Sequence, residues 1–377
     1  MKPLSNLRVI DFTTNISGPT LTMILADLGA EVIKIEKPAG DEARGMVPIQ
    51  HGNGVYFNNI NRGKKSVVID LKNENERAQI YKFIEGADIV VENFRQGVAS
   101  KLAIDYETVK TYNKEIIYCS LSAYGLKGPK KKFPGYDAIV QAETGLMSIT
   151  GNDQLARIPV SIIDQGSALW GVVGILSALQ KRQQTGEGSY VTTSLYETGV
   201  FWSNYHLLAA KLLQKNPQKL GTNHGAFAPY GAFKTNDGQI MVGISNDMLF
   251  QRFSEALEQQ QWLDNEDFQT NTKRVQHRAR LNEEIENVTK HYNTQQIVLA
   301  LEQARVPVAE VKSMLDVLSD EQLLENELLV DLTQQGQSIT VTRLPFQISS
   351  TNLTPNGPAP LLGEHTAYYL GASENEL

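Results

Sequence analysis

The chain has 377 residues, of which 41% are hydrophobic and 20% are charged, and its formal net charge is −7. This length predicts roughly two to three domains, and the acidic balance argues against general nucleic-acid binding. No run approaches the ~18 consecutive apolar residues of a membrane span, and the first residues show no signal-peptide pattern. A single cysteine, Cys119, excludes an internal disulfide, so we expect a cytoplasmic protein without membrane contact.

The charge is unevenly distributed along the chain. Through Gly135 there are 19 basic and 15 acidic residues, whereas the remainder carries 16 basic and 27 acidic residues. The first third is therefore where an anionic ligand is expected to bind.

Strand and helix patterns alternate from residue 7 to residue 195. The predicted strands are Arg8–Phe12, Glu31–Glu36, Val67–Leu71, Asp88–Asn93, Ile116–Ser122, Val160–Ile163 and Ser189–Tyr196. The predicted helices are Thr20–Leu28, Asn75–Glu85, Tyr106–Tyr112, Asp137–Met147 and Ala168–Arg182. This alternation predicts an α/β fold, with a Rossmann-like large domain built on a mostly parallel sheet.

The pattern changes after residue 195. Residues 1–195 are predicted to form the large domain, 196–224 a linker, and 225–310 a smaller α+β domain with a hairpin turn at Asn236–Gly238. A second linker is expected at 311–330, and residues 331–377 are expected to return to the large domain.

Cationic residues follow successive predicted strands. They include Lys37 and Arg44 after the second strand, Lys72 after the third, Arg95 and Lys101 after the fourth, and the basic loop 127–132 after the fifth. Since ligands on parallel sheets gather at the carboxyl ends of the strands, this set predicts a phosphate-rich ligand.

Several common sites are absent from the sequence. The turn after the first strand, Asn15–Pro19, has one glycine and lacks the Gly-x-Gly-x-x-Gly pattern of dinucleotide sites. No Walker-type loop occurs, and no His and Cys cluster has metal-ligand spacing, so no metal is expected.

Asp164 is the only acidic residue between Asp153 and Glu187, and it follows an apolar run at a predicted strand-to-helix turn. Backbone N–H groups at such a turn favour an anion. The residues alone allow two interpretations, a helix cap or a nucleophilic carboxylate.

Ordered motifs along the whole chain resemble family III CoA-transferases, the CaiB/BaiF family that includes formyl-CoA and carnitine-CoA transferases. The motifs are Leu7–Phe12 with Gly18-Pro19, Leu28–Pro38 with Gly40-Asp41 and Arg44, Asn61–Ser66 with Asp70–Lys72, Ala87–Phe94, Gly135–Asp137, Thr185–Gly188, Pro229–Gly231 with Asp237-Gly238, and Leu361–Thr366.

The resemblance implies transfer of CoA between an acyl-CoA donor and a carboxylic-acid acceptor, with CoA as substrate and no permanently bound cofactor. It implies that Asp164, 21 residues before Thr185, is the nucleophile. It also implies an interlocked, ring-like homodimer. Positions that match the family's CoA contacts are Ile16, Ser17, Lys37, Asp70, Leu71, Lys72, Asn93, Phe94, Arg95, Lys101 and Tyr136.

The implied mechanism passes through an acyl-aspartyl anhydride and an aspartyl-CoA thioester, both formed on Asp164. Backbone N–H groups near Gln165-Gly166 or near Ile16-Ser17 are expected to stabilise the oxyanions. Asp164 is also expected to cap the helix that begins near Ser167, and the N-terminus of this helix is expected to keep the carboxylate ionised.

Three departures from the family pattern bear on function. Lys37 and Lys101 stand where arginine is frequent, and 223–230 lacks the glycine run of the formyl-CoA group, which argues against formyl- or oxalyl-CoA. Tyr136 stands where related α-methylacyl-CoA racemases have histidine, so proton transfer at the α-carbon is disfavoured. A non-catalytic CoA-binding protein is the remaining alternative.

Overall fold

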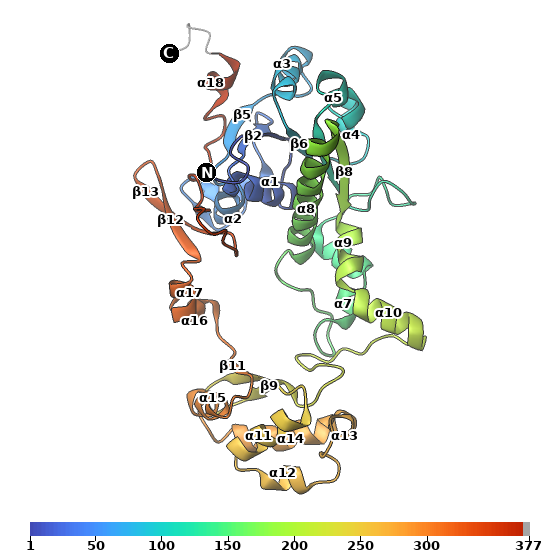
Figure 1. Ribbon diagram of the computed structural model, residues 1–377, viewed down its shortest axis with the longest axis vertical. Coiled ribbons are helices and arrows are strands. Elements are labelled where there is room, and N and C mark those ends of the chain that lie inside the picture. The colour runs from blue at the N-terminus through green and yellow to red at the C-terminus, as the bar shows by residue number, and fades with distance from the viewer. Residues whose placement is uncertain (372–377) are drawn as a thin grey trace. The chain divides into compact units, whose positions relative to one another are not determined.

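The computed structural model describes residues 1–371, which divide into two units (Figure 1). Unit 1 comprises Met1–Leu146, Ile158–Leu213 and the chain from Gln322 onward. Unit 2 comprises Met147–Arg157 and Gln214–Glu321. The short segment 147–157 therefore belongs to unit 2, although it precedes the helix that carries Asp164.

Within the described residues, unit 1 is built on six parallel strands in the order β5-β2-β1-β6-β7-β8. The strands are β1 (Arg8–Asp11), β2 (Glu31–Glu36), β5 (Lys65–Val68), β6 (Ile89–Glu92), β7 (Ile117–Ser122) and β8 (Ser189–Ser194). The chain adds strands outward from β1 on one side of the sheet and then from β6 on the other, which is a Rossmann-like strand order. The direction in which strands are added therefore switches between β1 and β6.

Helices cover both faces of this sheet (Figure 1). Helices α1 and α8 pack on one face and α3 and α5 on the other. The helices that lie wholly in unit 1 are α1 (Ser17–Asp27), the 3-10 helix η1 (Glu42–Gly45), α2 (Val55–Ile60), α3 (Glu74–Glu85), α4 (Val98–Lys101), α5 (Tyr106–Tyr112), α6 (Asp137–Glu143), α8 (Ile162–Thr185), α9 (Leu195–Trp202), α10 (Asn204–Leu213) and α18 (Thr366–Leu370). Two helices lie at the boundaries between the units, α7 (Leu146–Ile149) and α17 (Glu321–Glu325).

The core on one face packs α1 and α8 against the sheet. Leu21 of α1, Cys119 of β7 and Ile175 of α8 are fully buried there. Helix α8 is long and apolar enough to span a membrane, but more than half of its apolar window is buried in this core. Helix α8 is therefore a core helix of the α/β fold.

The opposite face carries a second core. Ile80 and Ile84 of α3 and Val109, in α5, pack there against the sheet, and Tyr369 of α18 joins them from the end of the described chain. Two small hairpins complete unit 1. They are β3 (Ile49–Gln50) with β4 (Asn53–Gly54), and β12 (Leu329–Gln334) with β13 (Gln337–Thr342).

Unit 2 has its own core around an antiparallel sheet with strand order β11-β10-β9. The strands are β9 (Tyr230–Lys234), β10 (Gln239–Gly243) and β11 (Val308–Glu310), and the hairpin predicted at Asn236–Gly238 is confirmed. The helices are α11 (Asp247–Ala256), α12 (Gln260–Asp264), α13 (Asn271–Gln276), α14 (Arg278–Thr289), α15 (Thr294–Gln303) and α16 (Met314–Leu318).

Two sequence predictions are wrong. The predicted strand Val160–Ile163 is absent, because α8 already begins at Ile162, where the Asp137 carboxylate accepts hydrogen bonds from its first-turn amides. The predicted helix 137–147 is two helices, α6 and α7, because Gly145 adopts a positive φ of 82° between them.

Close packing of α8 on α1 depends on Gly171. A Cβ at this position would lie 2.3 Å from Leu21 Cδ1. We expect Gly171→Val to lower the free energy of unfolding by about 2–3 kcal/mol, since a buried overlap forces the two helices apart. Thermal or urea denaturation measures the effect. Gly357→Val is the control, because a Cβ at Gly357 meets no atom within 4 Å. Equal destabilisation by both variants would contradict this packing argument.

Candidate active site

A cleft of about 670 Å³ opens at the carboxyl edge of the sheet, at the β1–β6 reversal. The loops after β1 and β6 are joined there by two hydrogen bonds. Thr14 N–H donates to Asn93 Oδ1 (3.0 Å), and Asn93 Nδ2 donates to the Thr14 carbonyl (2.8 Å). Asp164 lines the same cleft. The switch in strand order thus places the nucleophile candidate where ligands of such sheets bind.

The first turn of α1 supplies free backbone donors to this cleft. Ile16 and Ser17 line it, and α1 has no side-chain cap. Within residues 1–371, the amides of Ile16, Ser17 and Gly18 donate to no acceptor. Because a helix N-terminus carries a partial positive charge, these amides can bind a phosphate or an oxyanion.

Asp164 is the third residue of α8 and is only 8% exposed. Its carboxylate accepts no hydrogen bond from any residue that the structure describes. Burial, and then the nearby negative charge of Asp137, raise the pKa of Asp164 to about 7. The helix N-terminus therefore does not hold the pKa of this carboxyl at its ordinary value, because desolvation and the like charge of Asp137 raise it.

Asp137 caps α8 in place of Asp164. Its Oδ2 accepts hydrogen bonds from the backbone N–H groups of Ile163 (2.8 Å) and Asp164 (3.2 Å). Gln141 donates to the other oxygen of Asp137 and holds it in place. The cap interpretation of Asp164 is thus wrong. The sequence did not reveal the role of Asp137, because a cap normally adjoins its own helix.

Tyr56 of α2 is a second residue that the sequence analysis missed. Burial and the charge of Asp164 raise the pKa of Tyr56, and a hydrogen bond with Gln165 opposes this effect. Its phenol therefore stays neutral beside the Asp164 carboxyl. No sequence pattern around Tyr56 signals this proximity.

The predicted CoA contacts fall into two groups along the carboxyl edge. Six of them line the cleft: Ile16, Ser17, Asn93, Phe94, Arg95 and Tyr136. The others lie outside its lining. Lys37 follows β2 and pairs with Glu42, a cleft residue, Lys101 ends α4, and Asp70, Leu71 and Lys72 follow β5. Both groups belong to the same edge of one sheet.

One of the two expected oxyanion sites is unavailable. The Gln165 amide donates to the Ser161 carbonyl (2.9 Å), and Gly166 lies inside the hydrogen-bonded helix α8. The expectation for Gln165-Gly166 is therefore wrong, whereas the amides of Ile16 and Ser17 line the cleft and have no acceptor among the described residues.

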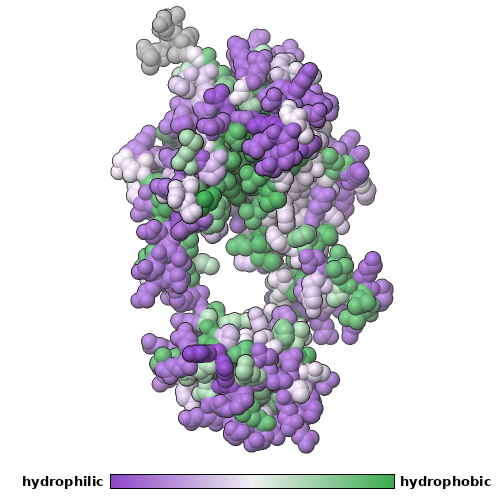
Figure 2. Space-filling model, in the orientation of Figure 1, coloured by the Kyte–Doolittle hydropathy of each residue, from purple (hydrophilic) through white to green (hydrophobic). Residues whose placement is uncertain are grey.

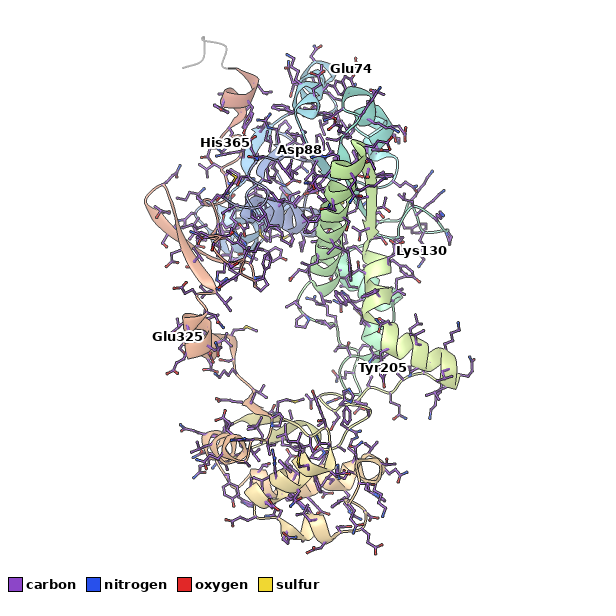
Figure 3. All side chains as sticks on the ribbon, in the orientation of Figure 1. Glu74, Asp88, Lys130, Tyr205, Glu325 and His365 are labelled. Atoms are coloured by element: carbon purple, nitrogen blue, oxygen red, sulfur yellow. The ribbon has the colours of Figure 1, made fainter. Side chains whose placement is uncertain are left out.

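The loop after β7 adds cations beside the cleft. Lys131 lines it, whereas Lys130, labelled in Figure 3, forms an ion pair with Glu143 (2.6 Å). No cluster of His, Cys, Asp or Glu suited to a metal ion occurs within residues 1–371.

Comparison with known proteins identifies the family. The model of CoA-transferase family III matches residues 4–366. The succinyl-CoA:mesaconate CoA-transferase of Haloarcula hispanica is 33% identical over 98% of this chain and 96% of its own length. The succinate–glutarate CoA-transferase of Agrobacterium fabrum is 33% identical over 99% and 96%. A crystal structure of a CAIB/BAIF family protein from Brucella suis superimposes with a TM-score of 0.89 at 32% identity, covering 97% of this chain and 98% of that one.

The chain therefore belongs to CoA-transferase family III, which confirms the resemblance seen in its motifs. It is a CoA-transferase, an enzyme that moves CoA between an acyl-CoA and a free acid. The α/β class with a parallel sheet is likewise confirmed.

The raised pKa of Asp164 predicts a pH-dependent stability. Its contribution is fully present below the unfolded-state pKa of 3.8 and is lost as the pH rises to about 7, because only the folded state resists ionisation. Asp164→Asn removes this loss. Relative to wild type, we expect the unfolding free energy of Asp164→Asn to be raised by about 2 kcal/mol more at pH 8 than at pH 5. Chemical denaturation at both pH values measures the gain. Equal changes at both would contradict the raised pKa.

Proposed function

We propose that Asp164 is the nucleophile of this CoA-transferase and carries both covalent intermediates. The carboxylate attacks the thioester carbonyl of the donor, the C–S bond breaks, and an acyl-aspartyl anhydride and CoA thiolate result. The thiolate then attacks the aspartyl carbonyl and releases the donor acid as its carboxylate, leaving aspartyl-CoA. The acceptor carboxylate attacks this thioester, the C–S bond breaks, and a second anhydride and CoA thiolate result. CoA thiolate finally attacks the acceptor acyl carbon and frees Asp164.

The observation that carries this proposal is the state of the Asp164 carboxyl. It is buried in the cleft, accepts no hydrogen bond among the described residues, and has a pKa raised to about 7. A carboxylate without hydrogen-bond donors keeps its electron density for attack, and near neutral pH about half of it is ionised. A carboxylate also suits the exchange chemically, because an anhydride is reactive enough to pass the acyl group on in either direction.

The free amides of Ile16 and Ser17 supply the complementary charge. They line the same cleft as Asp164 and have no protein acceptor among residues 1–371. Such amides bind either the diphosphate of CoA or the oxyanion of a tetrahedral intermediate. No general acid is required, because every leaving group is a thiolate or a carboxylate.

The substrates that we propose are dicarboxylic acids, with succinyl-CoA as donor. The relatives from Haloarcula hispanica and Agrobacterium fabrum carry names that specify succinyl-CoA or succinate with mesaconate or glutarate. Arg95 and Lys131 line the cleft with Asp164 and can pair with the distal carboxylate of such an acid. Monocarboxylic acids, which lack a second carboxylate, would leave the positive charge of Arg95 and Lys131 unmatched.

Asp164→Ala tests the nucleophile. We expect transfer from succinyl-CoA to glutarate to fall at least about 10³-fold, since no anhydride can form, while CoA still binds. Wild-type enzyme incubated with succinyl-CoA and then hydroxylamine should yield a hydroxamate at Asp164, detected by peptide mass spectrometry. Asp153→Ala, an exposed aspartate of unit 2, is the control. Transfer that persists in Asp164→Ala, or α-deuteration of a 2-methylacyl-CoA in deuterated water without an acceptor, would contradict the proposal.

We also propose that the enzyme is a homodimer, formed in part through an apolar patch on α8, α9 and α10. Figure 2 shows hydrophobic residues gathered over these helices. The exposed members of this patch are Leu169, Trp170, Val173, Leu176, Phe201, Trp202, Tyr205, Leu207, Leu208, Leu212 and Leu213. A contiguous apolar surface of this extent is typical of a protein interface. Tyr205, labelled in Figure 3, projects from α10.

Introducing negative charge into the apolar patch tests the dimer. Leu208 and Leu212, one turn apart on α10, are 63% and 82% exposed. Because a buried, unpaired carboxylate is costly, we expect Leu208→Glu with Leu212→Glu to weaken dimerisation at least about 100-fold without lowering the Tm of the monomer. Sedimentation equilibrium measures association. Leu155→Glu, at an 80% exposed site outside the patch, is the control. A wild-type monomer at micromolar concentration would refute the dimer.

A further inference from the structure

We propose that Lys34 is a positioning residue for CoA: from beneath the cleft, it fixes the loop Thr13–Ser17, whose free amides face the ligand. The inference rests on the proposed role of the Ile16 and Ser17 amides. Lys34 lies in β2, next to the central strand β1, and touches no ligand-facing surface because its side chain is fully buried.

Lys34 is one of four buried charged side chains below this loop. Lys34 Nζ pairs with Asp41 Oδ2 (2.9 Å), and Lys64 Nζ pairs with Asp11 Oδ2 (3.1 Å). All four side chains are inaccessible to solvent. Asp11 and Lys34 are also register partners on adjacent strands. Within these two pairs each cation has an anion, and the neighbouring buried Glu36 carboxylate is paired with Arg44, which satisfies the requirement that buried charges be paired.

These side chains hold the backbone of the loop at three points. Thr13 N–H donates to Asp11 Oδ1 (2.9 Å), Lys34 Nζ donates to the Thr13 carbonyl (2.7 Å), and Asn15 N–H donates to Asp41 Oδ1 (3.1 Å). Lys34 therefore acts twice, directly on Thr13 and through its ion pair with Asp41 on Asn15.

The backbone of Thr14, in the middle of the tethered stretch, is also fixed. Asn93 bonds both backbone groups of Thr14. Every backbone N–H from Thr13 to Asn15 thus has a side-chain acceptor, and Asn15 is held at a positive φ of 64°. Beyond Asn15 the tethers stop, and the next amides are those that lack an acceptor among the described residues. Such a loop is organised before the ligand arrives, so binding loses little conformational entropy.

The electrostatics agree with a fixed cation at Lys34. Burial opposes the charge of its ammonium group, but the carboxylates of Asp11, Asp41 and Glu36 together outweigh burial and raise its pKa. A buried ion-pair cluster often contributes little net stability compared with apolar residues of the same size. Three bonds of this cluster end on the loop that presents the free amides of Ile16 and Ser17 to the cleft, and Lys34 itself donates there to the Thr13 carbonyl, which points to positioning rather than to stability alone.

Lys34→Met tests the inference with CoA as the probe, by isothermal titration calorimetry together with thermal unfolding. The variant keeps the aliphatic stem but loses the bond to Thr13 and the pair with Asp41. We expect the Kd for CoA to rise about tenfold or more, because misdirected amides lose contact with the anion. The control is Arg182→Met, which breaks the Arg182–Asp88 pair (2.9 Å) at the opposite edge of the same sheet. It should lower the Tm while leaving the Kd for CoA within twofold.

Asp41→Asn is the second variant, and it decides the question if Lys34→Met does not fold. It keeps an oxygen acceptor for the Asn15 amide but removes the charge partner of Lys34, and we expect the Kd for CoA to rise about threefold or more. A folded Lys34→Met whose Kd for CoA stays within twofold of wild type would overturn the inference. So would a similar loss of CoA affinity in Arg182→Met. The titration measures CoA binding and requires no turnover, so it tests Lys34 independently of the nucleophile. If no Asp164 adduct formed, the proposed nucleophile would be wrong and the role of Lys34 would be unaffected.

Discussion

The site depends on one interaction, the hydrogen bonds that the Asp137 carboxylate accepts from the first-turn amides of α8. A helix N-terminus needs an acceptor for its amides, and Asp164 stands close enough in sequence to be that acceptor. Because Asp137 fills this role from another helix, the Asp164 carboxyl is left buried and without donors. Its pKa rises to about 7, which a capping carboxylate, stabilised by two amides, would not show.

The second constraint is the order of the strands. Strands are added on one side of β1 and then on the other side, beginning with β6. The loops that follow β1 and β6 therefore separate and leave a cleft above the sheet. The Thr14–Asn93 bonds fasten the two loops together at the base of the opening. Below them, the buried charges of Lys34 and Asp41 hold the first loop in place. Asp164, the free amides and the cleft cations then all lie on one edge.

Much of the fold could be predicted from local sequence. The strands β1, β2, β6 and β7 are rich in apolar residues between polar turns, and Asn236–Gly238 is a hairpin turn that needs no distant partner. Asp164 and the cleft residues Asn93 and Tyr136 were named from motifs. Local sequence failed where a distant residue decides the structure. Val160–Ile163 has the composition of a strand, yet α8 begins within it because Asp137, 26 residues before Ile163, caps the helix. The proximity of Tyr56 to Asp164 and the raised pKa of Asp164 also arise only in the folded chain.

The closeness of Asp137 and Asp164 has a further consequence for the catalytic cycle. In the resting enzyme at neutral pH, ionised Asp164 faces the negative charge of Asp137 in a buried setting. Each covalent form in the proposed cycle, whether anhydride or thioester, is neutral at Asp164. Acylation in the proposed cycle moves the negative charge from Asp164 to the CoA thiolate and so relieves the repulsion between the two side chains. Relief of this repulsion offsets part of the free energy of the activated acyl group.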